Sequence, residues 1–431
     1  MAVASFSRRH VLKTGAAPAL SLTASRYRQN AVRIEDVRFD FESYTYRTPM
    51  KFASRLIDRT TIVNVRTAVR TGDGRVVQGF ASMKMGNTWS FRSDVLTYDQ
   101  TLEVMCRLTE RLAAITAGCP EYAHPIDLNH MLEARYLEAA VRLAREMKLP
   151  EPIPKLCTQV TACPFDASVH DAFGKAHKRS CYQTNNSEFM PHCLEHYLSP
   201  EFKGEYPETY LRRRPVERLP LYHLVGAADA ITESDIARRI GDGLPETLEE
   251  WIRYNGLTHF KIKMQGNDLA WDVARTLAVH REVSAAQRKL GIAERYYSLD
   301  FNEMCPDVEY LLEFLAQVRE SSAEAFDRIQ YIEQPTKRDL RAGRAIRMHR
   351  AAEVKPVVVD ESLTDFETLL LARELGYSGV ALKACKGQSQ SVMIASAACK
   401  YKLFRCVQDL TCPGASLIHS AGLAAPVPGV A

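Results

Sequence analysis

The sequence predicts an α/β protein, a (β/α)7β TIM-like barrel preceded by an N-terminal α+β capping domain. Between residues 219 and 407, seven short apolar segments alternate with amphipathic helical segments. This rhythm is typical of parallel strands joined by right-handed crossovers. Residues 31–85 differ, because long segments of strand-like alternation flank the Gly72-Asp73-Gly74 turn, as in an antiparallel hairpin. The 431 residues leave room for two to three domains.

The elements of the first domain follow from periodicity. Strands are expected at residues 31–44, 60–71 and 76–85. Apolar residues then recur at helical spacing in segments 98–118, 129–148 and 166–179. Residues 182–218 are polar and contain prolines, which favours an irregular linker. We therefore place a signal segment at 1–30, the capping domain at 31–190 and the barrel domain at 191–431.

Seven strands are expected in the barrel domain, and their number and spacing favour a barrel over an open, doubly wound sheet. They are predicted at 219–225, 259–264, 296–301, 329–332, 356–359, 380–384 and 404–407. No GxGxxG, Walker or GxSxG pattern follows any of these segments. Nucleotide binding and serine hydrolase chemistry therefore receive no support.

Composition and charge narrow the function classes. Hydrophobic residues make up 46% of the chain and charged residues 25%, as in ordinary globular proteins. The net charge of +4 comes from four basic residues within the first 26, and the rest of the chain is balanced. A neutral body disfavours nucleic acid as a partner. No apolar run reaches the ~20 residues that would span a bilayer, so we expect no stable membrane insertion.

The N-terminus indicates export. Ser7-Arg8-Arg9-His10-Val11-Leu12-Lys13 resembles a twin-arginine signal, and a short apolar stretch follows it. We expect a periplasmic protein, with a cytoplasmic one as the alternative.

The 11 cysteines are an odd number and show no CxxC spacing. A zinc site could involve some of them together with nearby histidines, although the spacing matches no standard finger. Its residues would be Cys157, Cys163, Cys181, Cys193, His192 and His196. Buried free cysteines are the stronger expectation.

Charged side chains end five consecutive barrel strands. In a parallel barrel these ends meet at one mouth, where active sites lie. Buried unpaired charges are costly, so charges gathered there should compensate each other or bind an ion. The residues are Lys261, Lys263, Asp300, Glu333, Asp360, Glu361 and Lys383.

Three carboxylates from adjacent strands suit a hard divalent cation, and oxygen ligands without Cys or His favour Mg²⁺ over Zn²⁺. Spacing does not choose between Asp360 and Glu361 as the third ligand. Lys261 and Lys263 share one face of their strand, and their proximity to each other and to a divalent ion should depress an ammonium pKa towards neutrality. Such a lysine can act as a general base. Lys383 faces it across the mouth, so a proton could leave one face of a substrate and return to the other.

These motifs, in this order, resemble those of the enolase superfamily, in its mandelate racemase and muconate lactonizing branch. They are KxK at Lys261 and Lys263, DxN at Asp300, EQP at Glu333, DES at Asp360 and the Leu382-Lys383 element. Residues 170–176 resemble the helix that ends the family's capping domain. The resemblance covers about residues 31–431, and the motifs are specific as a set although each alone is weak.

The resemblance implies a Mg²⁺ ion that holds a substrate carboxylate and stabilises the enolate formed when the α-proton leaves. The implied metal ligands are Asp300, Glu333 and Asp360. Lys263 would be the base on one face and Lys383 the acid or base on the other, while Lys261 would stabilise the bound carboxylate. An aspartate as third ligand together with Lys383 points to the muconate-lactonizing and epimerase type.

Two features depart from the family pattern. Gly387-Gln388-Ser389 replaces a Gly-rich turn, and the chain ends at Ala431, before the last helix and C-terminal segment that return to the capping domain in the family. We expect a truncated or unusually closed barrel, whose exposed sheet edge favours a homo-oligomer. Substrate specificity is expected in the capping-domain loops at 48–56 and 86–92.

The leading expectation is therefore an isomerase, a racemase or epimerase acting on a small-molecule carboxylate. A cycloisomerase, or a lyase that dehydrates an acid sugar, is the alternative, because each needs only one base and a leaving group. A non-catalytic exported binding protein with a decayed barrel is an alternative of another class. The intact set of three carboxylates and three lysines argues against decay.

Overall fold

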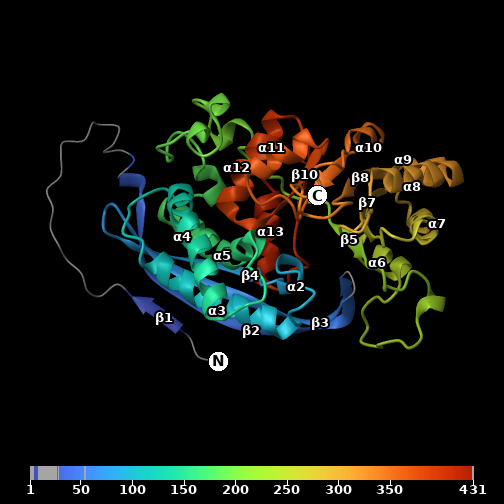
Figure 1. The fold of residues 1–431 in the computed structure, drawn as a ribbon, viewed down its shortest axis with the longest axis horizontal. Helices are drawn as coiled ribbons and strands as arrows, with labels where there is room; N and C mark the ends of the chain where they lie inside the picture. The colour runs from blue at the N-terminus through green and yellow to red at the C-terminus, as the bar shows by residue number, and fades with distance from the viewer. Residues whose placement is uncertain (1–3, 8–26, 28, 53–54, 430–431) are drawn as a thin grey trace.

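The computed structural model describes residues 4–7, 27, 29–52 and 55–429. The twin-arginine motif and its apolar stretch fall almost entirely on residues 8–26, outside the described residues. Two sheets organise the chain, an antiparallel four-stranded sheet and a parallel seven-stranded sheet (Figure 1). None of the helices in the described part is both long enough and apolar enough to cross a membrane.

The antiparallel sheet belongs to the capping domain and has the order β1-β2-β3-β4. Its strands are β1 (Ala4–Ser7), β2 (Val32–Phe52), β3 (Arg55–Thr71) and β4 (Val76–Lys84). β3 and β4 form the predicted hairpin, in which Gly74 has a φ of +88°, a left-handed conformation that glycine adopts without steric cost. The apolar side chains of Val65, Val69 and Met83 are fully buried.

The helices of this domain lie against one face of the sheet (Figure 1). They are α2 (Asn87–Ser90), α3 (Tyr98–Ala117), α4 (Pro125–Glu146) and α5 (Lys155–Ala176). α3 and α5 pack directly on the strands, and α4 packs on these two helices. α5 begins well before the predicted residue 166, because residues 156–165 are all buried and so lack the polar and apolar contrast that marks a surface helix.

Residues 177–221 form the linker between the two domains. They contain four short 3-10 helices, η1 (Cys181–Thr184), η2 (Leu194–His196), η3 (Pro200–Phe202) and η4 (Pro207–Thr209), and no strand. This agrees with the irregular segment predicted from the sequence.

All strands of the second sheet are parallel, in the order β11-β10-β9-β8-β7-β6-β5. They are β5 (Tyr222–Val225), β6 (His259–Lys263), β7 (Tyr296–Asp300), β8 (Ile329–Glu333), β9 (Val357–Val359), β10 (Gly379–Lys383) and β11 (Phe404–Gln408). The connecting helices are α6 (Leu248–Asn255), α7 (Leu269–Leu290), α8 (Val308–Ser321), α9 (Ala323–Asp327), α10 (His349–Val354), α11 (Phe366–Glu374) and α12 (Gln388–Lys400). The sequence therefore located all seven strands.

The parallel part of the predicted (β/α)7β barrel is confirmed, but its strands do not form a complete ring. β5 and β11 are the two edges and do not pair with each other, so the described sheet is a curled half-barrel. After β11 the chain forms α13 (Ala415–Ala424), which packs against β4 of the capping domain instead of adding a strand beside β5. Near this contact, Cys412 Sγ lies 3.8 Å from Met83 Sδ.

All 11 cysteines are free, and each is buried or partly buried, as expected.

Candidate active site

The C-terminal ends of β6 to β10 bring five of the six predicted residues, all except Glu333, to the lining of one cavity between the half-barrel and the capping domain. In the strand register, Asp300 of β7 lies between Lys263 of β6 and Glu333 of β8. Lys263, Asp300, Asp360 and Lys383 all line the cavity. Parallel strands with their carboxyl ends at one edge produce this convergence.

Lys261 lies at the centre of the charged group and is 5% exposed. Its Nζ is 2.6 Å from Glu333 Oε1 and 3.1 Å from Asp300 Oδ2, and it donates a hydrogen bond to Gln408 Oε1 at 3.2 Å. Burial lowers the pKa of Lys261, but attraction to Glu333 and Asp300 outweighs it and raises the pKa well above its ordinary value. The depressed pKa expected from the sequence supposes a divalent ion beside the lysines, and it stays a prediction.

Lys263 extends from the same strand toward the cavity. Its ammonium pairs with Asp300 Oδ2 and donates to Asn302 Oδ1 at 2.9 Å. Burial raises the pKa of Asp300, but Lys263 and Lys261 lower it more, so the carboxyl is held ionised. The DxN motif thus supplies two acceptors for one lysine.

Asp360 is bound by two lysines on the far side of the cavity. Lys383 Nζ is 2.7 Å from Asp360 Oδ2, and Lys386 Nζ is 3.0 Å from Oδ1. Against burial, these ammoniums lower the pKa of Asp360. Burial lowers the pKa of Lys383, yet Asp360 raises it above its usual range. Lys386 follows the Leu382-Lys383 element by three residues, and the sequence predicted no role for it.

Glu361 was left open as an alternative to Asp360, and its surroundings differ. Its Oε1 accepts a hydrogen bond from the Trp89 indole at 2.8 Å, and Oε2 has no partner. Burial, together with the nearby Asp360 and Glu303, raises the pKa of Glu361 to about 8. Of the two carboxyls, Asp360 carries the charge at neutral pH.

Trp89 belongs to the capping domain and covers the cavity. Lys383 Nζ lies 4.6 Å from the centroid of its ring, a cation–π distance. Arg338 donates to the Trp89 carbonyl at 2.9 Å and to Glu303 Oε1 at 2.6 Å. Sequence reasoning missed Trp89, Glu303 and Arg338. Arg338 is 249 positions from Trp89 and 35 positions from Glu303, and no local sequence pattern links residues so far apart.

The capping-domain loops expected to set specificity do face the cavity. Met50 from the first loop, and Asn87, Thr88 and Trp89 from the second, are among its lining residues. Three non-glycine residues at the ends of β7 and β8 adopt positive φ, Asn302 (+50°), Glu303 (+67°) and Gln334 (+32°). Such strain is typical of sites whose surroundings fix the backbone.

The Gly387-Gln388-Ser389 turn binds the two domains together. The Ser389 backbone N–H and Oγ both donate to Asp166 on α5, at 2.8 and 2.6 Å. Ser389 Oγ also lies 2.9 Å from His170 Nε2. Burial raises the pKa of Asp166 to about 6. The unusual turn therefore contacts the capping helix.

Comparison with known proteins supports this arrangement. A sequence model of the family described as Enolase C-terminal domain-like matches residues 243–431, and the known structures most similar in fold include proteins of the mandelate racemase and muconate lactonizing group. Residues 243–431 therefore match an enolase-type C-terminal domain, and the chain as a whole shares its fold with these neighbours. A search of curated proteins found no match.

Three solved structures illustrate the fold that this chain shares with its neighbours. A mandelate racemase/muconate lactonizing protein from Herpetosiphon aurantiacus is 20% identical, with 92% of this chain and 87% of that chain covered and a TM-score of 0.59. The L-Ala-D/L-Glu epimerase from Bacillus subtilis is 16% identical, with 92% and 88% covered and a TM-score of 0.58. An enolase from Bradyrhizobium, complexed with magnesium and mandelic acid, is 16% identical, with 93% and 87% covered and a TM-score of 0.58.

The structure thus brings all six residues predicted for catalysis and metal binding into one group. Asp300, Glu333 and Asp360 end three adjacent strands, and each is at most 2% exposed. Buried oxygen donors without Cys or His fit a hard divalent cation. Their role as ligands, and the roles of the three lysines, stay predictions.

Proposed function

We propose that this protein is a Mg²⁺-dependent enzyme that removes the α-proton of a carboxylate substrate, with racemisation or epimerisation as the reaction. The observation that carries the proposal is the placement of Lys263 and Lys383. They end β6 and β10, line the same cavity, and are separated by the three strands that carry the carboxylates. Two ammonium groups on opposite sides of one cavity suit proton removal from one face of a carbon and return to the other.

Asp300, Glu333 and Asp360 would hold the Mg²⁺ ion. The bound ion supplies positive charge that stabilises the substrate carboxylate and the developing enolate. The Bradyrhizobium neighbour was solved with magnesium and mandelic acid, and a dipeptide epimerase neighbour from Enterococcus faecalis with Mg and a dipeptide. Both ligands are small carboxylates, which supports the same substrate class here.

The charges of the site explain how a lysine becomes a base. Four ammonium groups face four carboxyl groups, Lys261, Lys263, Lys383 and Lys386 against Asp300, Glu333, Asp360 and Glu361. A dication added to this buried set must be offset by an anion or by the loss of a proton. A carboxylate substrate supplies the anion. Withdrawal of the carboxylates from Lys261 and Lys383 would lower the pKa values of these two ammonium groups, which the carboxylates now raise.

The three lysines and the residues around the cavity then have different roles. Lys263 Nζ accepts the α-proton on one face, and Lys383 Nζ delivers a proton to the other. Lys261, buried between Glu333 and Asp300, faces the substrate carboxylate. Trp89 and Arg338 close the cavity from the capping-domain side and exclude water.

The test is α-proton exchange in D₂O across a library of carboxylic acids and dipeptides, followed by NMR. For a racemase or epimerase, we expect Lys263→Ala to abolish exchange from one stereoisomer and Lys383→Ala from the other. Lys289→Ala, at an exposed ion pair on α7, is the control and should exchange like the parent. Exchange that survives both active-site substitutions unchanged would show that the assigned roles are wrong.

The same assay separates the other reactions. A cycloisomerase or an acid-sugar dehydratase would convert its substrate with one lysine acting as base, and the dehydratase would release water. An exported binding protein without turnover would bind acids but exchange no proton. The presence of all three carboxylates and all three lysines in one buried group argues against that class.

We also propose export to the periplasm, on the basis of the Arg8-Arg9 motif. Fusion of residues 1–30 to a reporter that is active only after export tests this. Arg8→Lys with Arg9→Lys should retain the reporter in the cytoplasm, whereas export of the double variant at the parental level would contradict the proposal.

A further inference from the structure

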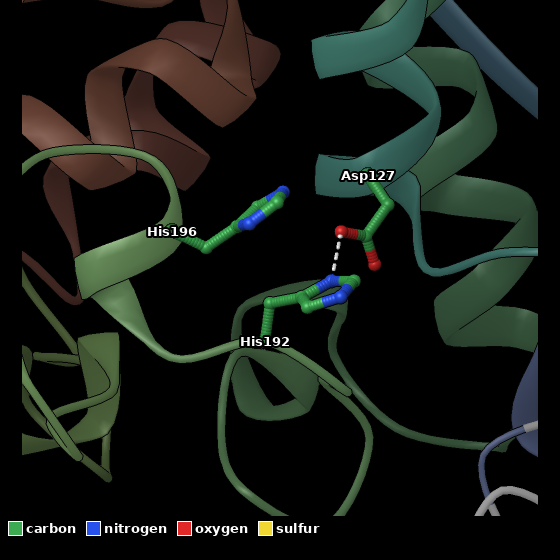
Figure 2. Close-up of side chains that lie close together, drawn as sticks. All are labelled: Asp127, His192 and His196. Atoms are coloured by element: carbon green, nitrogen blue, oxygen red, sulfur yellow. Dashed lines mark hydrogen bonds and ion pairs between the residues drawn. The ribbon is translucent and has the colours of Figure 1, made fainter.

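A second group of metal-binding side chains lies in the capping domain and linker, and it shares no residue with the lining of the active-site cavity. Asp127 comes from the first turn of α4, and His192 and His196 come from the linker around η2 (Figure 2). One donor atom of each residue lies within 4.8 Å of the other two. Across the described part of the chain, this is the one such trio of His, Cys, Asp or Glu donors found at that spacing.

The three side chains already point toward one another. His192 Nδ1 lies 2.9 Å from Asp127 Oδ1, and the rings of His192 and His196 stack with centroids 4.2 Å apart (Figure 2). Donor atoms of a tetrahedral site with metal–nitrogen bonds of about 2.0–2.1 Å lie roughly 3.4 Å apart. Small side-chain rotations would therefore bring these three onto one ion.

The Asp127 carboxylate supplies an independent observation. Its side chain is only 9% exposed. Oδ1 accepts hydrogen bonds from Tyr197 and His192, but Oδ2 is buried and has no hydrogen-bond partner among the residues that the structure describes. A buried carboxylate oxygen without a hydrogen bond is costly, and a metal ion beside the two histidines would satisfy it.

The donor set selects a different metal from that of the active site. Imidazole nitrogens favour Zn²⁺ and related transition-metal dications, whereas Mg²⁺ prefers oxygen ligands alone. His130 lies one turn after Asp127 on α4, and its ring centroid is 5.5 Å from that of His196. It lines one surface groove together with Asp127, His192 and His196.

We propose that Asp127, His192 and His196 form a second metal site, for a transition-metal dication of the Zn²⁺ class. Such an ion would attach the irregular linker to the start of α4. It would stabilise the capping domain by joining segments about 65 residues apart in the chain, without a part in the proton transfer.

The test uses the full chain after EDTA treatment, titrated with ZnCl₂ by calorimetry in excess Mg²⁺ so that the oxygen-ligand site is occupied. We compare the parent with His192→Ala/His196→Ala and with His349→Ala, which removes an exposed histidine on α10. The parent and His349→Ala should bind one more equivalent of Zn²⁺ than the double variant. In the parent, Zn²⁺ should also raise the midpoint of thermal unfolding, and in the double variant it should not.

Three further comparisons test whether the two histidines bind the metal ion. His192 and His196 are both exposed, so the double variant should unfold like the parent in EDTA. His196→Gln, which keeps a polar side chain, should weaken Zn²⁺ binding by roughly 100-fold. Co²⁺ in this site should show visible absorption without the thiolate charge-transfer band that cysteine ligands would give. Equal Zn²⁺ stoichiometry and equal thermal shifts in parent and double variant would overturn the proposal, as would a thiolate band that the double variant retains.

Discussion

Replacement of Lys261 by methionine tests the charge balance of the active site most directly. The Lys261 ammonium contacts both Glu333 and Asp300 and is almost fully buried. Methionine has a similar length but no charge. The Lys261→Met variant therefore leaves a buried excess of negative charge, because Glu333 keeps only Gln408 as a close donor.

The expected size of the effect follows from burial. Removal of one partner of a buried ion pair costs about 3–5 kcal/mol, which lowers the midpoint of thermal unfolding of a chain of 431 residues by about 3–6 °C. A matched control is Lys289→Met, which removes an exposed ion pair with Glu249 that contributes about 0–1 kcal/mol. Mg²⁺ would restore the missing positive charge, and at about one hundred times its dissociation constant it adds about 2.7 kcal/mol.

The assay is calorimetric unfolding of the parent and both variants, in EDTA and in Mg²⁺. We expect Lys261→Met to unfold well below the parent in EDTA and to gain more from Mg²⁺ than the parent does. A variant as stable as the parent in EDTA, or one that gains nothing from Mg²⁺, would refute the view that this lysine and the ion balance the same carboxylates.

Three further predictions follow from the structure. The Trp89 indole donates to Glu361, so Trp89 fluorescence in EDTA should change with a midpoint near pH 8. Glu361→Gln should abolish this change, and Mg²⁺ should move its midpoint to lower pH. A change that persists in the variant would show that Glu361 is not the titrating group. Burial raises the pKa of Asp166 from 3.8 to about 6, so ionisation of its carboxyl opposes folding. In urea titrations, the free energy of unfolding of the parent, relative to that of Asp166→Asn, should therefore fall as the pH rises from about 4 to about 6. Leu221 is 61% exposed beside the edge strand β5, so Leu221→Lys should lower the particle mass measured by light scattering, whereas the control Val141→Lys on α4 should not. Equal masses for the parent and Leu221→Lys would argue against self-association through that edge.

The strands and their terminal charges could be predicted because each is a short buried apolar run followed at once by polar residues. The change from apolar to polar residues marks where each strand ends. Because the strands are parallel, their C-terminal ends lie at the same edge of the sheet, and this places Lys261, Asp300, Glu333 and Asp360 close together regardless of how the helices pack. The start of α5 was not predictable in the same way. Its first half is buried all round, and a helix without an exposed face has no period to detect.

The contacts between domains were also beyond the sequence. The Trp89–Glu361 and Ser389–Asp166 hydrogen bonds join residues more than 200 positions apart. Nothing local marks either partner, because Trp89 reads as an ordinary core residue and Asp166 as a polar residue of a helix. The raised pKa values of Lys261 and Lys383 in the absence of a metal ion were not predictable for a related reason, since the carboxylates that pair with these lysines come from other strands.

The packing of α13 on β4 has a consequence for how the chain folds as it is made. β4 is synthesised more than three hundred residues before the helix that packs against it. Domains generally fold as they leave the ribosome, the N-terminal one first. Here the surface of β4 that receives α13 stays uncovered until α13 has emerged, so the first domain completes its packing only after the whole half-barrel has been synthesised.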